Sequence, residues 1–330
     1  MQVSVPVHSP QIEAEKHSRE LSLLIKQRAL AEGFEKVGIV PAAPLHEEHN
    51  QLKRWLDRGF HGQMSWMARD PHLRSDPQRL MPGSRSVVVV AKNYFTPAKH
   101  SDDPATGKVS RYAWGDDYHD VVGAKLRSLL SWIKQTTPSA EGKVCVDIQP
   151  MMDKAWAVRA GLGWLGKHTN VITTEYGSWV FIGELLLNVE LEYDQHIAED
   201  HCGTCTLCIE ACPTAAITEP YVVDSNKCIS YQTIESREPQ LPKEIGEKLG
   251  AWLYGCDICQ DVCPWNRFEQ VTDELRFEPR AGNVNAQLTD IIEMTPESYA
   301  GRYRHSAMKR AKLSGLKRNA LTLLQNREAD

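Results

Sequence analysis

Cys202-x2-Cys205-x2-Cys208-x3-Cys212-Pro213 is the stretch that decides the fold of this 330-residue chain. A lone Cys228 follows, and then Cys256-x2-Cys259-x3-Cys263-Pro264, so that eight of the nine cysteines lie between His201 and Pro264. The first run has the spacing of bacterial ferredoxins, in which three thiolates bind one cubane cluster and the fourth reaches a second cluster. Eight thiolates of this kind predict two 4Fe–4S clusters.

The same spacing predicts which cysteines share a cluster. In the ferredoxin pattern, the last cysteine of each run binds the cluster of the other run. The chain differs from a simple ferredoxin in its second half, where the first ligand, Cys228, lies far upstream of Cys256. One cluster is expected on Cys202, Cys205, Cys208 and Cys263, and the other on Cys212, Cys228, Cys256 and Cys259.

Three other uses of these cysteines fit the pattern less well. Zinc favours four ligands in two pairs, whereas here three cysteines at x2 spacing precede a fourth that stands before proline. Disulfides need an oxidising compartment, which nothing in the sequence indicates. A radical enzyme that uses S-adenosylmethionine would need Cys-x3-Cys-x2-Cys, and that order does not occur.

Length and composition indicate a soluble protein of about two domains. Hydrophobic residues make up 42% and charged residues 25% of the chain, which is ordinary for a globular protein. No apolar run approaches the roughly 20 residues of a membrane span, and Met1 to Pro10 carries no secretory signal. With free thiols and oxygen-sensitive clusters, we expect a cytoplasmic monomer that has no membrane partner.

Hydrophobic periodicity and turn signals predict an α+β fold. A strand-rich mixed domain is expected over residues 1–195, and a cluster domain with a helical C-terminal segment over residues 196–330. Residues 96–109 are expected to form a loop. Helices are predicted at 11–33, 51–70, 120–134, 153–159, 241–255 and 285–325, and strands at 36–40, 87–91, 143–148 and 178–187.

Some motifs have simpler explanations than the sites they suggest. Gly161-Leu-Gly163-Trp-Leu-Gly166 follows a helical run instead of a strand, so we interpret Gly161 as a helix cap and not as part of a dinucleotide fingerprint. Gly166-Lys167-His168 lacks the serine or threonine of a phosphate loop. His46 and His49 have no third metal ligand nearby, and Cys145 is predicted to be a small buried side chain.

The net charge of −5 is unevenly distributed. Residues 302–318, which we call the basic segment, hold seven basic residues and no acidic one, while the remainder carries 31 basic and 43 acidic residues. Such a segment is either a site for a polyanion or a solvated helix face, and charge alone does not distinguish the two. The seven are Arg302, Arg304, Lys309, Arg310, Lys312, Lys317 and Arg318.

The size of the first domain indicates that a compound is reduced within this protein. A free ferredoxin needs far fewer residues, and the first 195 residues contain no metal motif. Any redox centre there is expected to be an organic or corrin cofactor. From the residues alone, an enzyme and a plain electron-transfer module both remain open.

Several segments resemble the epoxyqueuosine reductase family, in collinear order from about residue 15 to residue 326. They include the cysteine runs. The others are Arg69-Asp70-Pro71, Pro82-Gly83-Ser84-Arg85-Ser86-Val87, Ser110-Arg111-Tyr112-Ala113-Trp114-Gly115-Asp116-Asp117-Tyr118-His119, Val146-Asp147, Arg159-Ala160-Gly161-Leu162-Gly163-Trp164-Leu165-Gly166-Lys167-His168-Thr169, Gly177-Ser178-Trp179, Gly183-Glu184, Cys228-Ile229-Ser230-Tyr231, Lys309-Arg310-Ala311 and Leu316-Lys317-Arg318-Asn319-Ala320.

The resemblance implies a fold and a reaction. The first domain would be a nitroreductase-like cobalamin-binding domain, and the second a ferredoxin-like domain. Members reduce the epoxide of epoxyqueuosine, at the wobble position of a tRNA anticodon, to queuosine. They use cobalamin and two 4Fe–4S clusters, which implies an external low-potential electron donor. A corrinoid reductase of a small molecule, similar to reductive dehalogenases, is the alternative.

The resemblance also implies site residues. Loss of the epoxide oxygen as water consumes two protons, and a buried carboxylic acid that stays protonated is the expected donor. Asp147 is the first choice and Asp153 the second; without the resemblance, Asp147 would be interpreted as a strand-end residue. Tyr112 and His119 are expected to shape the nucleobase pocket. Cobalamin contacts are expected from Arg69, Arg111, Asp147, Thr169, Val171, Ile172, Gly183, Ser230, Cys256 and Asp257, and tRNA contacts from Ser236, Glu238, Lys309, Arg310 and Lys317.

Overall fold

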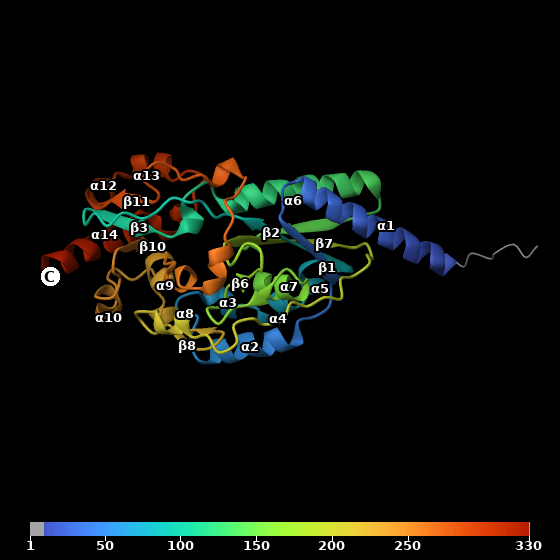
Figure 1. Cartoon of the computed structure of the whole chain (residues 1–330), viewed down its shortest axis with the longest axis horizontal. Coiled ribbons are helices and arrows are strands. Elements are labelled where there is room, and N and C mark those ends of the chain that lie inside the picture. Colours follow the sequence, from blue (N-terminus) through green and yellow to red (C-terminus); the bar gives the residue numbers. More distant parts are fainter. Residues whose placement is uncertain (1–9, 330) are drawn as a thin grey trace, which may run out of the picture.

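The computed structural model describes residues 10–329, so the expectation about a signal at Met1 to Pro10 lies almost entirely outside the described residues. None of the helices within residues 10–329 combines the length and the hydropathy that a membrane crossing requires. The chain contains both helices and strands and its main sheet is antiparallel, so the predicted α+β architecture is confirmed. Figure 1 shows the N-terminal helix at one end of the molecule and the C-terminal helix at the other.

The strands are β1 (Lys36–Pro41), β2 (Ser86–Asn93), β3 (Thr106–Val109), β4 (Gly142–Cys145), β5 (Trp164–Leu165), β6 (Val171–Ile172), β7 (Val180–Leu187), β8 (Ile217–Glu219), β9 (Val222–Val223), β10 (Trp252–Tyr254) and β11 (Asn285–Gln287). The α-helices are α1 (Pro10–Ala31), α2 (His46–Asp57), α3 (Ser65–Ala68), α4 (Pro71–Ser75), α5 (Pro77–Leu80), α6 (Tyr118–Thr136), α7 (Asp153–Arg159), α8 (Leu207–Glu210), α9 (Ile229–Ile234), α10 (Lys243–Gly246), α11 (Ile258–Asp261), α12 (Leu288–Glu293), α13 (Pro296–Arg302) and α14 (Lys312–Ala329).

A four-stranded antiparallel sheet, in the order β1-β2-β7-β4, forms the centre of the N-terminal half. Helices α1 and α6 contact one face and α7 contacts the other (Figure 1). On β2, Val88 and Val90 pack in one core with Leu126 of α6, whereas Val87 and Val89 pack in another with Trp156 of α7. Because both faces are covered, residues 87–91 of β2 form a continuous apolar run without polar alternation.

A second sheet joins the two halves of the chain. Its middle strand is β3, which pairs in parallel with β10 and antiparallel with β11. Trp114, shortly after β3, shares a core with Leu316 of α14. The N-terminal half therefore contributes a strand and core residues to the C-terminal half, and the boundary predicted at residue 195 stays a prediction.

Several predicted elements are partly wrong. The helix predicted at 285–325 begins instead with strand β11, and the rest is divided into α12, α13 and α14. The loop predicted at 96–109 contains β3, whose Gly107 is needed because a Cβ there would lie 2.6 Å from the Cβ of Leu253. The helix predicted at 241–255 ends early, and its Trp-Leu-Tyr run is the buried strand β10. The helix predicted at 51–70 is divided, because Gly59 and Gly62 adopt positive φ values of 67° and 54° after α2.

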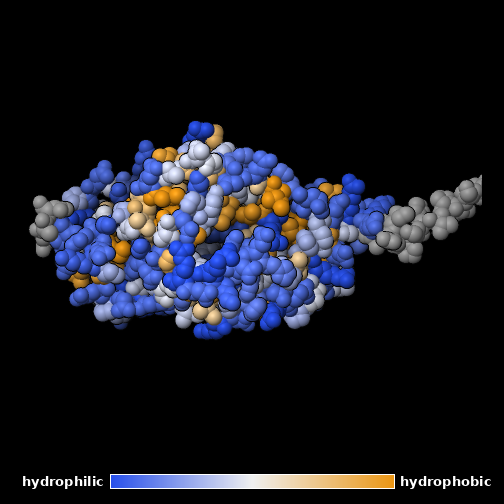
Figure 2. All heavy atoms as spheres, turned by 90° about the horizontal axis from the view of Figure 1, so that it is seen from below, coloured by the Kyte–Doolittle hydropathy of each residue, from blue (hydrophilic) through white to orange (hydrophobic). Residues whose placement is uncertain are grey.

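Other expectations are confirmed. Helix α7 spans the predicted residues 153–159, and Gly161 follows it with a φ of 70°, as a helix cap requires. Cys145 is fully buried. The strand predicted at 143–148 is confirmed only as far as Cys145; the expectation that it carries Asp147 at its end is wrong, since Asp147 lies two residues beyond it. Figure 2 shows patches of hydrophobic side chains among the mostly hydrophilic residues of one face of the molecule.

Candidate active site

A cavity of about 500 Å³ lies between the N-terminal sheet and the cysteine-rich region. With the space at its open mouth, the volume is about 1650 Å³. Strand β7, helix α7, the segment 168–171 and parts of residues 212–230 and 256–260 line this central cavity. Its size falls within the range of small-molecule and cofactor sites.

Four cysteines line the central cavity together: Cys212, Cys228, Cys256 and Cys259. We call them the inner set; they are the four that the spacing assigned to one cluster. Burial raises the pKa of the Cys228 thiol and, far more, that of Cys256 and Cys259. As free thiols they would stay protonated, whereas bound metal would hold them as thiolates.

The other four cysteines, the outer set, surround a smaller cavity of about 170 Å³: Cys202, Cys205, Cys208 and Cys263. The structure thus brings together both predicted sets. The Nζ of Lys167, which is 9% exposed, donates to the backbone oxygens of Gly203 (2.6 Å) and Cys205 (2.9 Å) and so fixes the loop of the outer set. His168 lines both cavities and therefore lies between the two sets.

The spread of the cysteines differs from that of a single-ion site. Within residues 10–329, no three His, Cys, Asp or Glu side chains are arranged to hold one metal ion. Each set instead lines a cavity, which suits a cluster of several atoms better than zinc.

Asp147 faces the central cavity from the turn after β4. Its φ of 54° is strained for a residue with a side chain, and Thr169, on the same cavity, has a φ of 66°. Such strain costs about 1–3 kcal/mol per residue and is concentrated at functional sites. The Asp147 side chain is 60% exposed and accepts a hydrogen bond from the Tyr118 hydroxyl.

The protonation predicted for Asp147 is wrong in this structure. Burial acts to raise its pKa, but the contacts with His119 and Tyr118 outweigh burial and lower the pKa. Nε2 of His119 lies 3.5 Å from Oδ2 of Asp147, and its Nδ1 lies 2.6 Å from Oδ1 of Asp117. Although burial opposes it, these two carboxylates raise the pKa of His119 to about 9. The resting site therefore holds an imidazolium between two carboxylates.

Asp153, the second choice, also lines the central cavity, at the first turn of α7. Burial and then the charge of Asp147 raise its pKa to about 6. Behind it lies Glu184 of β7, which is fully buried. Burial and then the charge of Asp153 raise the pKa of Glu184 well above its ordinary value. The carboxyl groups with raised pKa values are therefore those of Asp153 and Glu184, and not that of Asp147.

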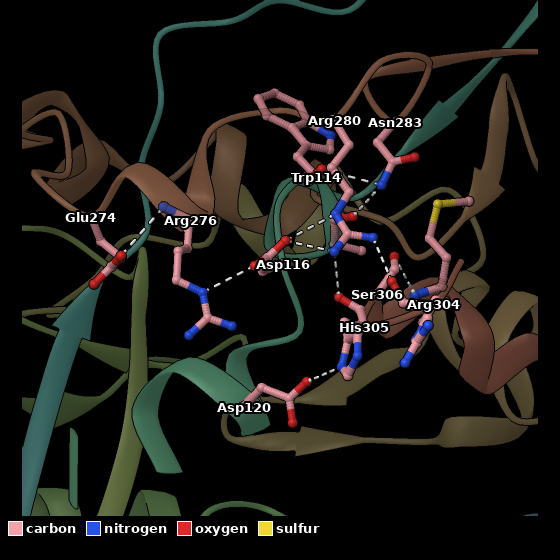
Figure 3. Close-up of polar contacts among 12 residues, drawn as sticks. Trp114, Asp116, Asp120, Glu274, Arg276, Arg280, Asn283, Arg304, His305 and Ser306 are labelled. Atoms are coloured by element: carbon pink, nitrogen blue, oxygen red, sulfur yellow. Dashed lines mark hydrogen bonds and ion pairs between the residues drawn. The ribbon is translucent and has the colours of Figure 1, made fainter. Parts of the chain in front are cut away.

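The segment that carries Tyr118 and His119 is anchored by the C-terminal half (Figure 3). The guanidinium of Arg280 donates to Oδ1 of Asp116 at 2.5 and 3.0 Å and to the His305 carbonyl at 2.8 Å. The same His305 carbonyl accepts from the Asp117 backbone N–H at 2.8 Å. The His305 imidazole pairs with Asp120 at 2.9 Å. The position of His119 therefore depends on residues some 160 to 190 positions away.

The predicted cobalamin residues divide into two groups. Asp147, Thr169, Val171, Ser230 and Cys256 line the central cavity, as does Tyr112, which donates to the Tyr254 hydroxyl at 2.9 Å. Arg69, Arg111, Ile172, Gly183 and Asp257 do not line it.

Each residue of the second group has a different environment. Arg69 is exposed, and Ile172 lines the outer cavity. Gly183 faces α6, where a Cβ would lie 2.8 Å from Leu126, so close helix packing explains the glycine. Asp257 is 2% exposed; it accepts from the Ser110 hydroxyl and, at 2.7 Å, from the Arg111 N–H, and thereby holds the cavity wall.

The predicted tRNA residues lie close together near the basic segment. Lys309, Arg310 and Glu238 are exposed, and Lys317 is half-buried. Ser236 is 3% exposed, so in this structure its side chain has no access to an RNA, which corrects that expectation.

Two arginines of the basic segment have partners within the protein. Arg310 forms a bidentate pair with Glu235, with both distances at 2.7 Å. Arg318 is buried and donates to the backbone oxygens of Gln232, Ser236 and Glu238. Arg318 is therefore structural, and the accessible charge of the segment is smaller than the sequence suggests.

Three residues at the site were missed by sequence reasoning: Tyr118, Lys154 and Glu184. Tyr118 stands directly before His119, and Lys154 directly after Asp153, within segments that drew attention for other reasons. Lys154 lines the central cavity and donates to Asn170 at 2.9 Å. The signal for Glu184 was a glutamate inside an otherwise apolar strand, since charged residues are rarely buried without a reason.

Two cysteine sets beside a cavity with an acid–histidine site define the class of this protein: it is an oxidoreductase with an iron–sulfur domain. The family described as "4Fe-4S double cluster binding domain" matches residues 201–266, and that described as "Epoxyqueuosine reductase QueG, DUF1730" matches residues 74–148. The chain belongs to the epoxyqueuosine reductase family, as the following relatives show.

Relatives that carry the family name are similar over most of the chain. The epoxyqueuosine reductase of Synechocystis sp. is 47% identical over 88% of this chain and 100% of the relative. That of Cellulophaga algicola is 44% identical over 92% of this chain and 97% of the relative.

Solved structures of the family have the same fold. A crystal structure of epoxyqueuosine reductase with an epoxyqueuosine-modified tRNA(Tyr) stem loop has a TM-score of 0.87 at 30% identity, over 93% of this chain and 81% of that one. A Bacillus subtilis structure, with the loop of a catalytic aspartate swung out of the active site, has a TM-score of 0.86 at 28% identity, over 93% of this chain and 82% of that one.

Proposed function

We propose that this chain reduces the epoxide of epoxyqueuosine in a tRNA anticodon to queuosine, using cobalamin that is reduced through two 4Fe–4S clusters. One observation carries the proposal: the inner cysteine set and Asp147 border the same cavity. Electrons and a proton can therefore be delivered to one place. The relatives' names and the related structure with a modified tRNA stem loop support the substrate.

The central cavity fits a corrin. Apolar side chains such as Val171, Ile182 and Ile258 offer surfaces for the faces of the macrocycle. Ser110, Asn170 and other polar groups on the same wall can hydrogen-bond to the amide groups at its edge. When bound, cobalamin would supply a strongly reducing cobalt centre.

The two cysteine sets give the electron path a direction. The outer set, which lines a separate cavity without Asp147, would receive electrons from an external low-potential donor. The inner set would pass them to the central cavity. Bound cobalamin and substrate would fill the cavity and displace water from the reducing centre, which would limit loss of electrons to side reactions.

Asp147 would deliver a proton from its carboxyl group to the epoxide oxygen. Tyr118 and His119 then stabilise the carboxylate that remains, since both contact Oδ2. Because Tyr118 and His119 favour the charged form of Asp147, this residue must be protonated again within each turnover. A general acid of this kind contributes about 100- to 10,000-fold to a rate.

The tRNA would bind across the basic segment, with phosphates near Lys309 and Lys317 and the modified base turned into the central cavity. Arg310 would contribute less, because its charge is paired with that of Glu235. The monomeric state, the cytoplasmic location and the identity of the electron donor remain predictions.

An anaerobic assay tests the function. The cluster- and cobalamin-loaded enzyme, reduced with a low-potential chemical reductant, is incubated with tRNA that contains epoxyqueuosine. Nucleosides are then analysed by mass spectrometry, with tRNA that carries unmodified guanosine as the control. We expect epoxyqueuosine to be replaced by queuosine. Unchanged epoxyqueuosine would refute the proposal, and reduction of a small molecule by the same sample would then favour the alternative reductase.

A further inference from the structure

Two carboxyl groups lie behind Asp147 in an arrangement that the reaction described above does not use. Glu184 projects from β7, opposite Cys145 of β4, and is fully buried. Neither of its carboxyl oxygens receives a hydrogen bond from an N–H or hydroxyl donor, and the same is true of Oδ1 of Asp153. Helix α7, which carries Asp153, packs against β7, which carries Glu184, and the two carboxyl groups act on each other's pKa. Two carboxyl groups can form a hydrogen bond only when one of them carries a proton.

The surroundings do not compensate two negative charges there. The charged and titratable groups that face the pair are Asp147, Cys145, Tyr118, Lys154 and Arg74. Lys154 and Arg74 act on Asp153 and Asp147, at the cavity, and neither contributes to the environment of Glu184. Burying an unpaired carboxylate is costly, so the pair retains a proton instead. The raised pKa values of Asp153 and Glu184 agree with this geometry.

The reaction consumes one proton more than Asp147 holds. When an epoxide becomes an alkene, both C–O bonds break, a carbon–carbon double bond forms, and the oxygen leaves as water. The balance is two electrons, which the external donor supplies through the clusters, and two protons, both delivered to the same oxygen. Asp147 can carry one proton at a time. A second must reach it within the same turnover.

We propose that Glu184 stores this second proton and that Asp153 passes it to Asp147 during turnover. The proposal rests on the proposed function. Asp153 is suited to the relay because it borders the cavity with Asp147 and contacts Glu184 on its other side. Glu184 would thus hold a proton for Asp153 to pass on and would not contact the substrate.

Glu184→Gln tests the proposal, because the amide keeps the shape of the side chain but cannot give up a proton to a carboxylate. Glu190→Gln is the matched control, since Glu190 lies just beyond the same strand but pairs with Arg85 at the surface. In the loaded enzyme, single-turnover conversion by Glu184→Gln should be nearly normal at pH 6 and roughly tenfold slower than wild type at pH 8. Glu190→Gln should follow wild type at both values.

A second readout does not depend on activity. Infrared spectra of the wild-type protein at neutral pH should contain the C=O band of a buried protonated carboxyl group, and this band should be absent from Glu184→Gln. If Glu184→Gln does not fold, the wild-type spectrum alone tests the proposal. The band should then persist as the pH is raised to 8, and its loss would overturn the proposal. Absence of the band from wild type, or a variant with the wild-type pH profile, would overturn the proposal. If wild type shows the band but does not convert epoxyqueuosine, the proposed function fails while the proton store stands.

Discussion

Nε2 of His119 lies 3.5 Å from Oδ2 of Asp147, which places an imidazolium beside the carboxyl group that faces the cavity. The pairing opposes the protonation expected of a proton donor, because it favours the charged form of Asp147. After Asp147 has donated its proton, the pairing keeps it charged. A proton source nearby is therefore needed to regenerate the acid. Asp153, on the same cavity, occupies the position that such a source requires.

Asp147→Asn should retain both clusters and cobalamin but lose about 100- to 10,000-fold in turnover, because the amide cannot donate a proton to the epoxide oxygen. Visible spectra measure cofactor content, and nucleoside analysis measures turnover. Asp57→Asn, an exposed aspartate at the end of α2, is the control and should behave as wild type. Normal turnover by Asp147→Asn would exclude Asp147 as the proton donor.

The stability that His119 contributes should depend on pH. Its pKa is raised from 6.5 to about 9, so its contribution is complete below pH 6.5 and is lost as the pH rises through 9. The shift corresponds to at most about 3 kcal/mol. Anaerobic urea unfolding should therefore show a difference between wild type and His119→Gln that is largest at pH 6 and small at pH 10. A difference that stays constant over this range would show that His119 is not held as an imidazolium.

Arg280→Lys should destabilise the protein by about 2 kcal/mol, because a lysine cannot bond to Asp116 and the His305 carbonyl together. The segment that positions His119 would also loosen, so the pH dependence of turnover should change along with stability. Arg267→Lys, an exposed arginine, serves as the control. Unchanged unfolding by Arg280→Lys would mean that the network in Figure 3 does not anchor the segment.

Charge reversal at Lys309 and Lys317 should weaken tRNA binding and reduce its salt dependence, by a slope of about 0.7–0.9 for each lost phosphate contact. Arg310 is left unchanged because its reversal would also break the pair with Glu235. Lys16→Glu is the control: its side chain is 75% exposed on α1, far from the basic segment (Figure 1). Binding measured at several salt concentrations distinguishes the outcomes, and an unchanged slope would mean that the segment is only solvated.

The sequence predicted well those features that depend on local spacing. The two sets of cysteines follow from a ferredoxin pattern, and the helix at 153–159 from its local periodicity. It predicted poorly the features that depend on distant partners. Strand β3 is stable because it lies between β10 and β11, which come about 140 or more residues later.

The environment of the acid could not be derived from the sequence for the same reason. The pKa of Asp147 depends on His119 and Tyr118, and Glu184 lies next to Asp153 only because β7 pairs with β4 beside α7. The basic segment gave a further error of this type. The count of charges in the basic segment treated Arg318 as accessible. In the folded chain Arg318 is buried and donates hydrogen bonds to three carbonyl groups.

If the cavity between the inner cysteines and Asp147 holds the corrin on which the epoxide is reduced, conversion depends on cobalamin. One cluster-loaded preparation is compared with and without added cobalamin, and queuosine in tRNA is measured after a single anaerobic turnover. We expect queuosine only in the sample with cobalamin. Equal amounts of queuosine in both samples would contradict it.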